Sequence, residues 1–328
     1  MSTSPAVSVV LTTYNQAKWL RESVDSVIGQ TFRDWELLLV DNGSTDETPQ
    51  LLEEYRKRND PRIIIKRYDQ NLHNTTISNT AFREARGKYV CLLYGDDYFL
   101  PTKLEKQFRF IETLPEEFGL VYCDAYKHID ATGELIPHQM PRMRGYVLEQ
   151  LLQSPPQIWT IAPMIRRQCL LEYPYNEQRF MEGEGVFLKI AMRYKFDYQE
   201  EILFAMRQQE RNMGREIDAG LLRHMGIFED LFAHPHFPPD KKHLHGQAKA
   251  WIHRTKGWEV IRVERRYDQG RKWLMEAIRQ DRRALLDKRL LLGLAVSALP
   301  RVASDRVIDA MDGVFGRPPR PPKEFYGV

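Results

Sequence analysis

Short apolar runs alternate with segments of helical spacing along the first 125 residues. Each run has the length and composition of a buried strand, and the runs cover residues 7–11, 36–40, 63–65, 89–93 and 120–122. Apolar side chains recur at helical spacing between them, in residues 19–28, 48–59, 78–85 and 101–111. Strands that alternate with helices predict an α/β fold with a largely parallel sheet covered on both faces.

Polar side chains follow three of the predicted strands. These clusters are residues 12–15, 41–44 and the pair Asp96-Asp97. The carboxyl ends of parallel strands lie along one edge of a sheet, where ligands of such folds bind. The convergence of the three clusters therefore indicates a ligand site at that edge.

The adjacent carboxylates of Asp96 and Asp97 would repel each other at the rim of a sheet. A divalent cation removes this repulsion, and a cation with few protein ligands usually shares its remaining positions with phosphates. The chain contains neither a P-loop nor a Gly-x-Gly-x-x-Gly motif after a strand. We therefore expect a diphosphate to be held through the cation.

The pattern changes after residue 214. Residues 1–214 carry 26 basic and 30 acidic side chains, whereas residues 215–328 carry 22 and 15. We predict a first domain over residues 1–214 and an α-helical C-terminal domain over residues 215–328, with a Pro-rich tail.

Several features of the C-terminal domain allow two interpretations. The apolar segment 290–299, flanked by basic residues, could lie on an anionic membrane or pack as a buried helix. Trp251, Trp258 and Trp273 are more typical of a helical core than of a nucleic-acid surface, so we expect no nucleic-acid partner. Histidines 234, 236, 243 and 245 do not have a recognised zinc-ligand spacing.

The three cysteines lack metal-type spacing, and the first residues show no secretion signal. No apolar stretch is long enough to span a bilayer. We therefore expect a cytoplasmic protein, with the inner face of the membrane as a possible peripheral contact.

Four stretches of the chain resemble family 2 glycosyltransferases: residues 7–15, 26–32, 36–46 and the Asp96-Asp97 strand end. The resemblance implies a GT-A fold and an inverting transfer from a nucleotide-sugar donor, with Mn²⁺ or Mg²⁺ as cofactor. It also implies a hydroxyl acceptor on a glycan, a polysaccharide or a lipid-linked molecule. A uracil or thymine nucleotide suits Asp41 best.

The resemblance also assigns roles to individual residues. Thr12 and Tyr14 would contact the nucleotide, and Asp41 or Asn42 would bind the edge of the base. Asp96 would face the ribose or the sugar, and Asp97 would bind the cation. Asn79 belongs to the same nucleotide-sugar site.

The chain departs from the family pattern at four positions. Tyr94 replaces the first aspartate of the Asp-x-Asp-Asp strand end, Ser78 replaces an arginine, and Gln209 replaces a histidine. Gly183 stands where the family has its catalytic aspartate.

The catalytic base is therefore sought among the neighbours of Gly183. An inverting transfer needs a carboxylate that takes the proton of the acceptor hydroxyl. Glu184 is favoured over Glu182, although both could be carboxylates placed at a helix start by the helix dipole. The alternative function is a catalytically weakened nucleotide-sugar binding module.

Overall fold

The computed structural model describes residues 4–153, 158–179, 182–209 and 217–315. These residues form two compact units, of which unit 1 is Met1–Leu148 with Pro156–Gln209 and unit 2 is Glu149–Pro155 with Glu210–Val328. The predicted domain boundary at residue 214 and the Pro-rich tail both lie outside the described residues.

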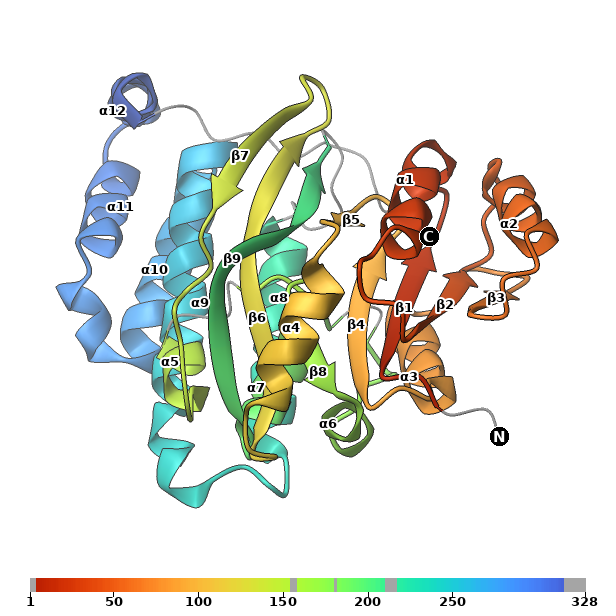
Figure 1. Cartoon of the computed structure of the whole chain (residues 1–328). Coiled ribbons are helices and arrows are strands. Elements are labelled where there is room, and N and C mark those ends of the chain that lie inside the picture. The colour runs from red at the N-terminus through yellow and green to blue at the C-terminus, as the bar shows by residue number, and fades with distance from the viewer. Residues whose placement is uncertain (1–3, 154–157, 180–181, 210–216, 316–328) are drawn as a thin grey trace. The chain divides into compact units, whose positions relative to one another are not determined.

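Unit 1 is built on a sheet in the strand order β3-β2-β1-β4-β8-β6-β9-β5, with β7 paired to β6 (Figure 1). Its strands are β1 (Val7–Thr13), β2 (Trp35–Asp41), β3 (Ile63–Arg67), β4 (Tyr89–Tyr94), β5 (Tyr98–Phe99), β6 (Phe118–Ile129), β7 (Glu134–His138), β8 (Met164–Arg166) and β9 (Lys195–Gln208). Strands β3, β2, β1 and β4 are parallel, as predicted. The other half is mixed, because β8 runs antiparallel between β4 and β6 while β6 and β9 are parallel.

The central strands of the parallel half of the sheet are buried because helices cover them. All seven residues of β1 and of β2 are buried. In α1, the buried side chains Leu20, Ser23, Val24 and Val27 follow the three-to-four-residue period that places them on one helix face. The helices of unit 1 are α1 (Ala17–Ile28), α2 (Thr48–Lys57), α3 (Asn74–Glu84), α4 (Lys103–Glu112), α6 (Arg167–Glu172) and α7 (Gly185–Ala191).

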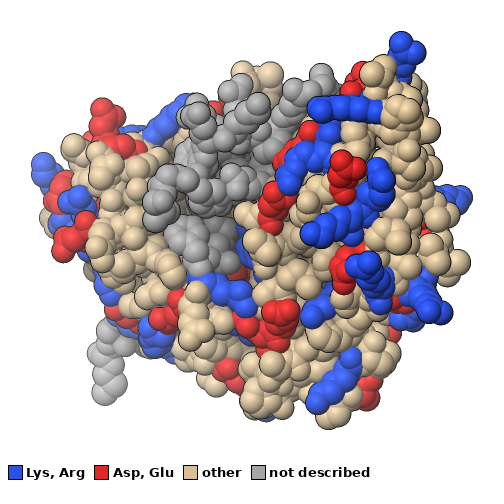
Figure 2. Space-filling model, turned by 180° about the vertical axis from the view of Figure 1, so that it is seen from behind, with Lys and Arg blue, Asp and Glu red and all other residues tan. Residues whose placement is uncertain are grey.

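Unit 2 is helical. It contains α8 (Ile217–Ala233), α9 (His245–Glu259), α10 (Tyr267–Gln280), α11 (Lys288–Ala298) and α12 (Arg301–Phe315), and α5 (Leu148–Gln153) falls almost entirely within it. Trp273 is buried and Trp258 packs against the apolar core, as expected for core residues. On the face seen in Figure 2, Lys and Arg alternate with Asp and Glu instead of forming one continuous basic surface.

Two further features of the sequence can be placed in unit 2. The ring of His245 packs 4.5 Å from that of Phe232, and the described part of the chain holds no cluster of three or more His, Cys, Asp or Glu able to bind a metal. None of the described helices has both the length and the apolar character needed to cross a membrane.

A glycine contact joins α9 and α10. A Cβ atom at Gly270 would lie 2.8 Å from the carbonyl oxygen of Gly257 and 2.2 Å from Cγ1 of Ile261. Both distances are shorter than any packed core allows, so the close approach of the two helices requires glycine at this position.

We predict that Gly270→Ala lowers the free energy of unfolding by about 1–3 kcal/mol because the helices must separate. The matched control is Gly313→Ala in α12, where nothing lies within 4 Å of the added Cβ. That variant should be neutral or gain up to about 1 kcal/mol. Urea unfolding of the two variants measures both values, and equal stabilities would contradict the packing described.

Candidate active site

Three neighbouring strands end at the same edge of the sheet and bring their polar ends together. Thr13 of β1 lies opposite Asp41 of β2, and Thr12 lies opposite Tyr94 of β4. The backbone N–H of Asn42 donates to the carbonyl of Thr13 at 2.9 Å. The edge predicted from the sequence is therefore formed by the residues that were assigned to it.

The loop after β1 is fastened to the loop after β2 through Asn15. This residue has a positive φ of 52°, a conformation that asparagine tolerates better than most residues. Its backbone N–H donates to Oγ of Ser44 at 2.9 Å, and its Oδ1 accepts from the N–H of Thr45 at 2.8 Å. The fixed loop leaves the ring of Tyr14 exposed at the rim and Thr12 buried beneath it.

Asp41 is a buried carboxylate at the end of β2. Its Oδ1 accepts from the backbone N–H of Ser44 at 3.0 Å. Its Oδ2 lies 3.3 Å from Nε of Arg67 as an ion pair, but it accepts no hydrogen bond from any described residue. Asp41 thus keeps an acceptor that a ligand could use.

The amides of Asn42 and Asn79, both assigned to the ligand, are engaged within the protein. Asn42 donates to Asn71 Oδ1 at 2.8 Å and to the carbonyl of Leu72 at 3.0 Å, and accepts from the N–H of Leu72 at 2.9 Å. Asn79 donates to the carbonyl of Tyr175 at 2.9 Å and accepts from its N–H at 2.9 Å. Both side chains position the loops that border the site.

The Asp96-Asp97 turn follows β4, and its two carboxylates differ in exposure. Asp97 is 3% exposed, and its Oδ1 accepts from the backbone N–H of Arg207 at 2.8 Å. Asp96 is half-buried and accepts from Nε2 of Gln209 at 2.7 Å. Gln209, which the resemblance places at a family histidine, therefore does lie beside this turn.

Burial raises the pKa of both carboxyls. For Asp97 the pKa lies well above its usual range, because the group is desolvated and because the charge of Asp96 is adjacent. For Asp96 desolvation is again the largest cause. A positive charge bound between them would reverse both effects, since an opposite charge favours the ionised form.

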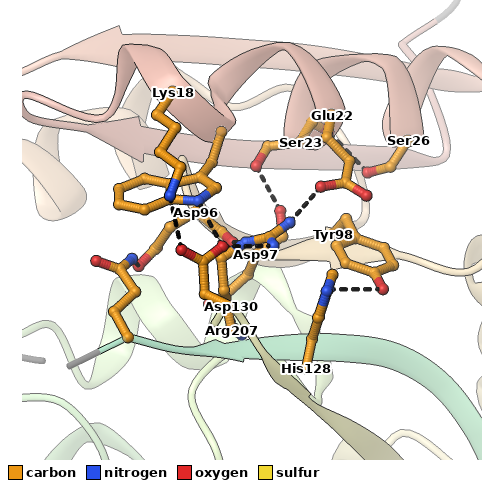
Figure 3. Close-up of polar contacts among 12 residues, drawn as sticks. Lys18, Glu22, Ser23, Ser26, Asp96, Asp97, Tyr98, His128, Asp130 and Arg207 are labelled. Carbon is orange, nitrogen blue, oxygen red and sulfur yellow. Dashed lines mark hydrogen bonds and ion pairs between the residues drawn. The ribbon is translucent and has the colours of Figure 1, made fainter. Parts of the chain in front are cut away.

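Arg207 supports this turn from β9, a role that the sequence analysis missed (Figure 3). Its side chain is 5% exposed, and its Nε donates to the carbonyl of Asp96 at 3.0 Å. Its Nη1 donates to Asp130 at 3.0 Å, and its Nη2 forms an ion pair with Glu22. The only sequence signal was a charged residue directly after the apolar run 203–206.

The segment before α7 holds the two glutamates considered as catalytic base. Glu182 is buried in an ion pair with Lys189, at 2.9 Å between Oε1 and Nζ, and its Oε2 accepts from the N–H of Asn176 at 2.6 Å. Glu184 is only partly buried, and its side chain forms no capping hydrogen bond with the described α7. Its carboxylate is thus the more available of the two.

Glu184 also lies close enough to Tyr94 to affect its ionisation. The pKa of the Tyr94 hydroxyl is raised to about 12, chiefly by burial, and the negative charges of Glu184 and Asp97 contribute in the same direction. Tyr94 therefore lies near both the strand-end carboxylates and the candidate base.

Three of the four departures from the family pattern border one pocket. Its lining is polar and aromatic and comprises Asn74, Thr75, Ser78, Tyr94, Tyr175, Glu182 and Gly183. Gly183 has a positive φ of 56°, and an added Cβ would meet nothing within 4 Å. The sequence differences at positions 78, 94 and 183 are therefore changes to a single cavity.

The fold is of the GT-A type. The structure resembles TarS of S. aureus in complex with UDP-GlcNAc, with a TM-score of 0.64 and 17% identity over 93% of this chain and 92% of that chain. It also resembles a mannosyltransferase from Pyrobaculum calidifontis in complex with GDP-Man and Mn²⁺, with a TM-score of 0.59 and 17% identity over 97% and 89% of the two chains. The predicted GT-A fold is confirmed.

The chain belongs to glycosyltransferase family 2, because residues 8–171 match the family described as Glycosyl transferase family 2. An uncharacterized glycosyltransferase of Methanocaldococcus jannaschii is 32% identical over 63% of this chain and 72% of its own length. A putative teichuronic acid biosynthesis glycosyltransferase of Bacillus subtilis, TuaG, is 37% identical over 33% and 42% of the two chains. The resemblance seen in the sequence is confirmed.

We predict that Arg207→Met lowers the free energy of unfolding by about 1–3 kcal/mol, because the backbone carbonyl of Asp96 loses its charged hydrogen-bond donor. The matched control is Arg193→Met, whose side chain is exposed and pairs with Glu172. An exposed ion pair contributes only about 0–1 kcal/mol. Urea unfolding distinguishes the two, and equal losses would show that Arg207 does not support the turn.

Proposed function

We propose that this enzyme transfers a sugar from a nucleoside-diphosphate sugar, UDP- or dTDP-linked, to a hydroxyl of a glycan, polysaccharide or lipid-linked acceptor. The transfer inverts the anomeric carbon and depends on a divalent cation. The observation that carries the proposal is the Asp96-Asp97 turn, placed beside Thr12 and Asp41 at one sheet edge and backed by Arg207. The nucleotide-sugar complexes of the two similar structures support this class of donor.

The donor set at the turn fits Mn²⁺ or Mg²⁺. Asp96 and Asp97 offer oxygen ligands, and burial raises the pKa of each carboxyl, an effect that a bound cation would oppose by favouring the ionised form. Two carboxylates leave coordination positions for the diphosphate, as hard cations with few protein ligands require. Once bound, the cation would stabilise the negative charge that develops on the leaving diphosphate.

Residues at the ends of β1 and β2 would hold the nucleoside. The unsatisfied acceptor of Asp41 suits the N–H of a uracil or thymine ring. The exposed ring of Tyr14 offers a face on which the base can stack. Asn42 and Asn79 would act indirectly, because their amides hold the bordering loops.

Glu184 would serve as the catalytic base. Glu182 is neutralised by Lys189 and its second oxygen accepts from a backbone N–H, so it would have to lose a buried ion pair to accept a proton. Among the described residues, Glu184 has neither constraint. It can therefore remove the proton of the acceptor hydroxyl while the cation side of the site receives the leaving diphosphate.

We predict that Asp97→Asn abolishes the Mn²⁺-dependent rise in melting temperature given by UDP-sugars, since the amide cannot ligate the cation as an anion does. The control is Asp240→Asn, an exposed aspartate of unit 2, which should respond to the same ligands as the unaltered chain. A normal response by the Asp97 variant would contradict the metal assignment.

We predict that Glu184→Gln reduces transfer by about 10²–10⁴-fold while donor binding stays unchanged, because only proton removal is lost. Adding Gly183→Asp to that variant should restore part of the activity. Aspartate adopts the left-handed backbone more readily than most residues, and an added Cβ meets no described atom within 4 Å. Undiminished transfer by Glu184→Gln would exclude Glu184 as the base.

The second candidate, a nucleotide-sugar binding module with weakened catalysis, is favoured by Gly183 at the position of the family's base. The unaltered chain tests it directly. Donor binding without transfer or donor hydrolysis, together with transfer gained in Gly183→Asp, would establish the module in place of the enzyme.

A further inference from the structure

Helix α11 (Lys288–Ala298) is apolar on both faces, but unit 2 covers only one of them. Leu290 and Val296 are fully buried and belong to the core formed with α9, α10 and α12. On the opposite side Leu291 and Leu292 are exposed, as is Leu299 directly after the helix. A helix that is hydrophobic all round is normally buried, so its second face lacks a partner within the described chain.

The uncovered apolar surface extends beyond the helix. The described residues include fourteen exposed large hydrophobic side chains, and six of them fall between residues 285 and 302. These six, here called the α11 face, are 38% to 83% exposed and comprise Leu285, Leu286, Leu291, Leu292, Leu299 and Val302. The exposed apolar side chains of the described chain are therefore concentrated on this segment.

The charges at the border of the α11 face are positive. Lys288, Arg289 and Arg301 form no ion pair with any other described residue, and their side chains flank the leucines. The nearby acidic groups are already engaged. Asp287 caps α11 through the N–H of Arg289 at 2.8 Å and pairs with Arg254 at 3.0 Å, and Asp281 pairs with Arg283.

We infer that the α11 face docks on the surface of an anionic lipid membrane. Leucines would enter the boundary between headgroups and acyl chains while the basic side chains meet the lipid phosphates, which is the composition of an interfacial helix. Each basic residue near an anionic surface adds to the binding. A second copy of this chain fits less well, because residues 281–306 carry six basic and three acidic side chains and two such surfaces would repel.

The α11 face would lie on the surface of the membrane, and helix α11 would not cross it. The eleven residues of α11 are fewer than the roughly twenty that span a bilayer. The apolar stretch of residues 290–299, which the sequence allowed either to pack internally or to face a membrane, is therefore divided between the two roles. Leu290 and Val296 pack internally, and Leu291, Leu292 and Leu299 face outward.

Co-sedimentation of the full chain with vesicles tests the inference. We expect binding to phosphatidylcholine vesicles that contain phosphatidylglycerol, and weaker binding to phosphatidylcholine alone or at high salt. The double variant Leu291→Ser/Leu292→Ser should bind the anionic vesicles at least about tenfold more weakly than the unaltered chain. The double variant Lys288→Glu/Arg289→Glu should lose the preference for anionic lipid.

Leu222→Ser is the matched control, since Leu222 is a strongly exposed leucine of α8 in the same unit but outside the α11 face. It should bind vesicles like the unaltered chain, and all the leucine variants should keep the same melting temperature and the same donor hydrolysis. The inference is overturned if the unaltered chain binds no vesicle, if the double leucine variant binds normally, or if that variant instead dissociates a dimer in size-exclusion chromatography.

Discussion

The buried guanidinium of Arg207 is the contact on which the candidate site depends. It donates to the carbonyl of Asp96 while its own backbone N–H donates to the carboxylate of Asp97, so one residue of β9 fixes both members of the acidic pair. The same side chain pairs with Asp130 and Glu22. The positive charge of the guanidinium thus offsets part of the negative charge of these carboxylates. The remaining negative charge is available to bind a dissociable cation together with its diphosphate. Removing the arginine would therefore affect stability and ligand geometry together.

Much of unit 1 could be predicted because its signals are local. The runs ending at Thr12, Asp41 and Asp96 are short and apolar, and parallel strands bring their ends to one edge whatever the details of packing. The mixed half of the sheet was harder to predict from the sequence. Strand β8 is only three residues long, and its antiparallel pairing with β4 joins residues 164–166 to residues 89–91. The residues of β8 alone predict neither the direction of the strand nor its position in the strand order of the sheet.

Individual roles within the site were harder to predict, because they depend on contacts between distant residues. The side chains of Asn42 and Asn79 could hydrogen-bond a ligand, but in the fold they form hydrogen bonds with the backbone of Leu72 and Tyr175. The sequence offers both Glu182 and Glu184, and the buried contacts of Glu182 with Lys189 and the N–H of Asn176 distinguish the two. The sequence showed Ser78, Tyr94 and Gly183 as separate departures from the family pattern, whereas the fold joins them in one pocket.

The central claim is that a divalent cation at the Asp96-Asp97 turn holds the diphosphate of the donor. Calorimetric titration of UDP into the unaltered chain, with Mn²⁺ and then with EDTA in place of the metal, tests it most directly. The account predicts saturable binding with Mn²⁺ and an affinity at least about tenfold lower, or no measurable heat, with EDTA. Equal affinity under the two conditions would contradict it.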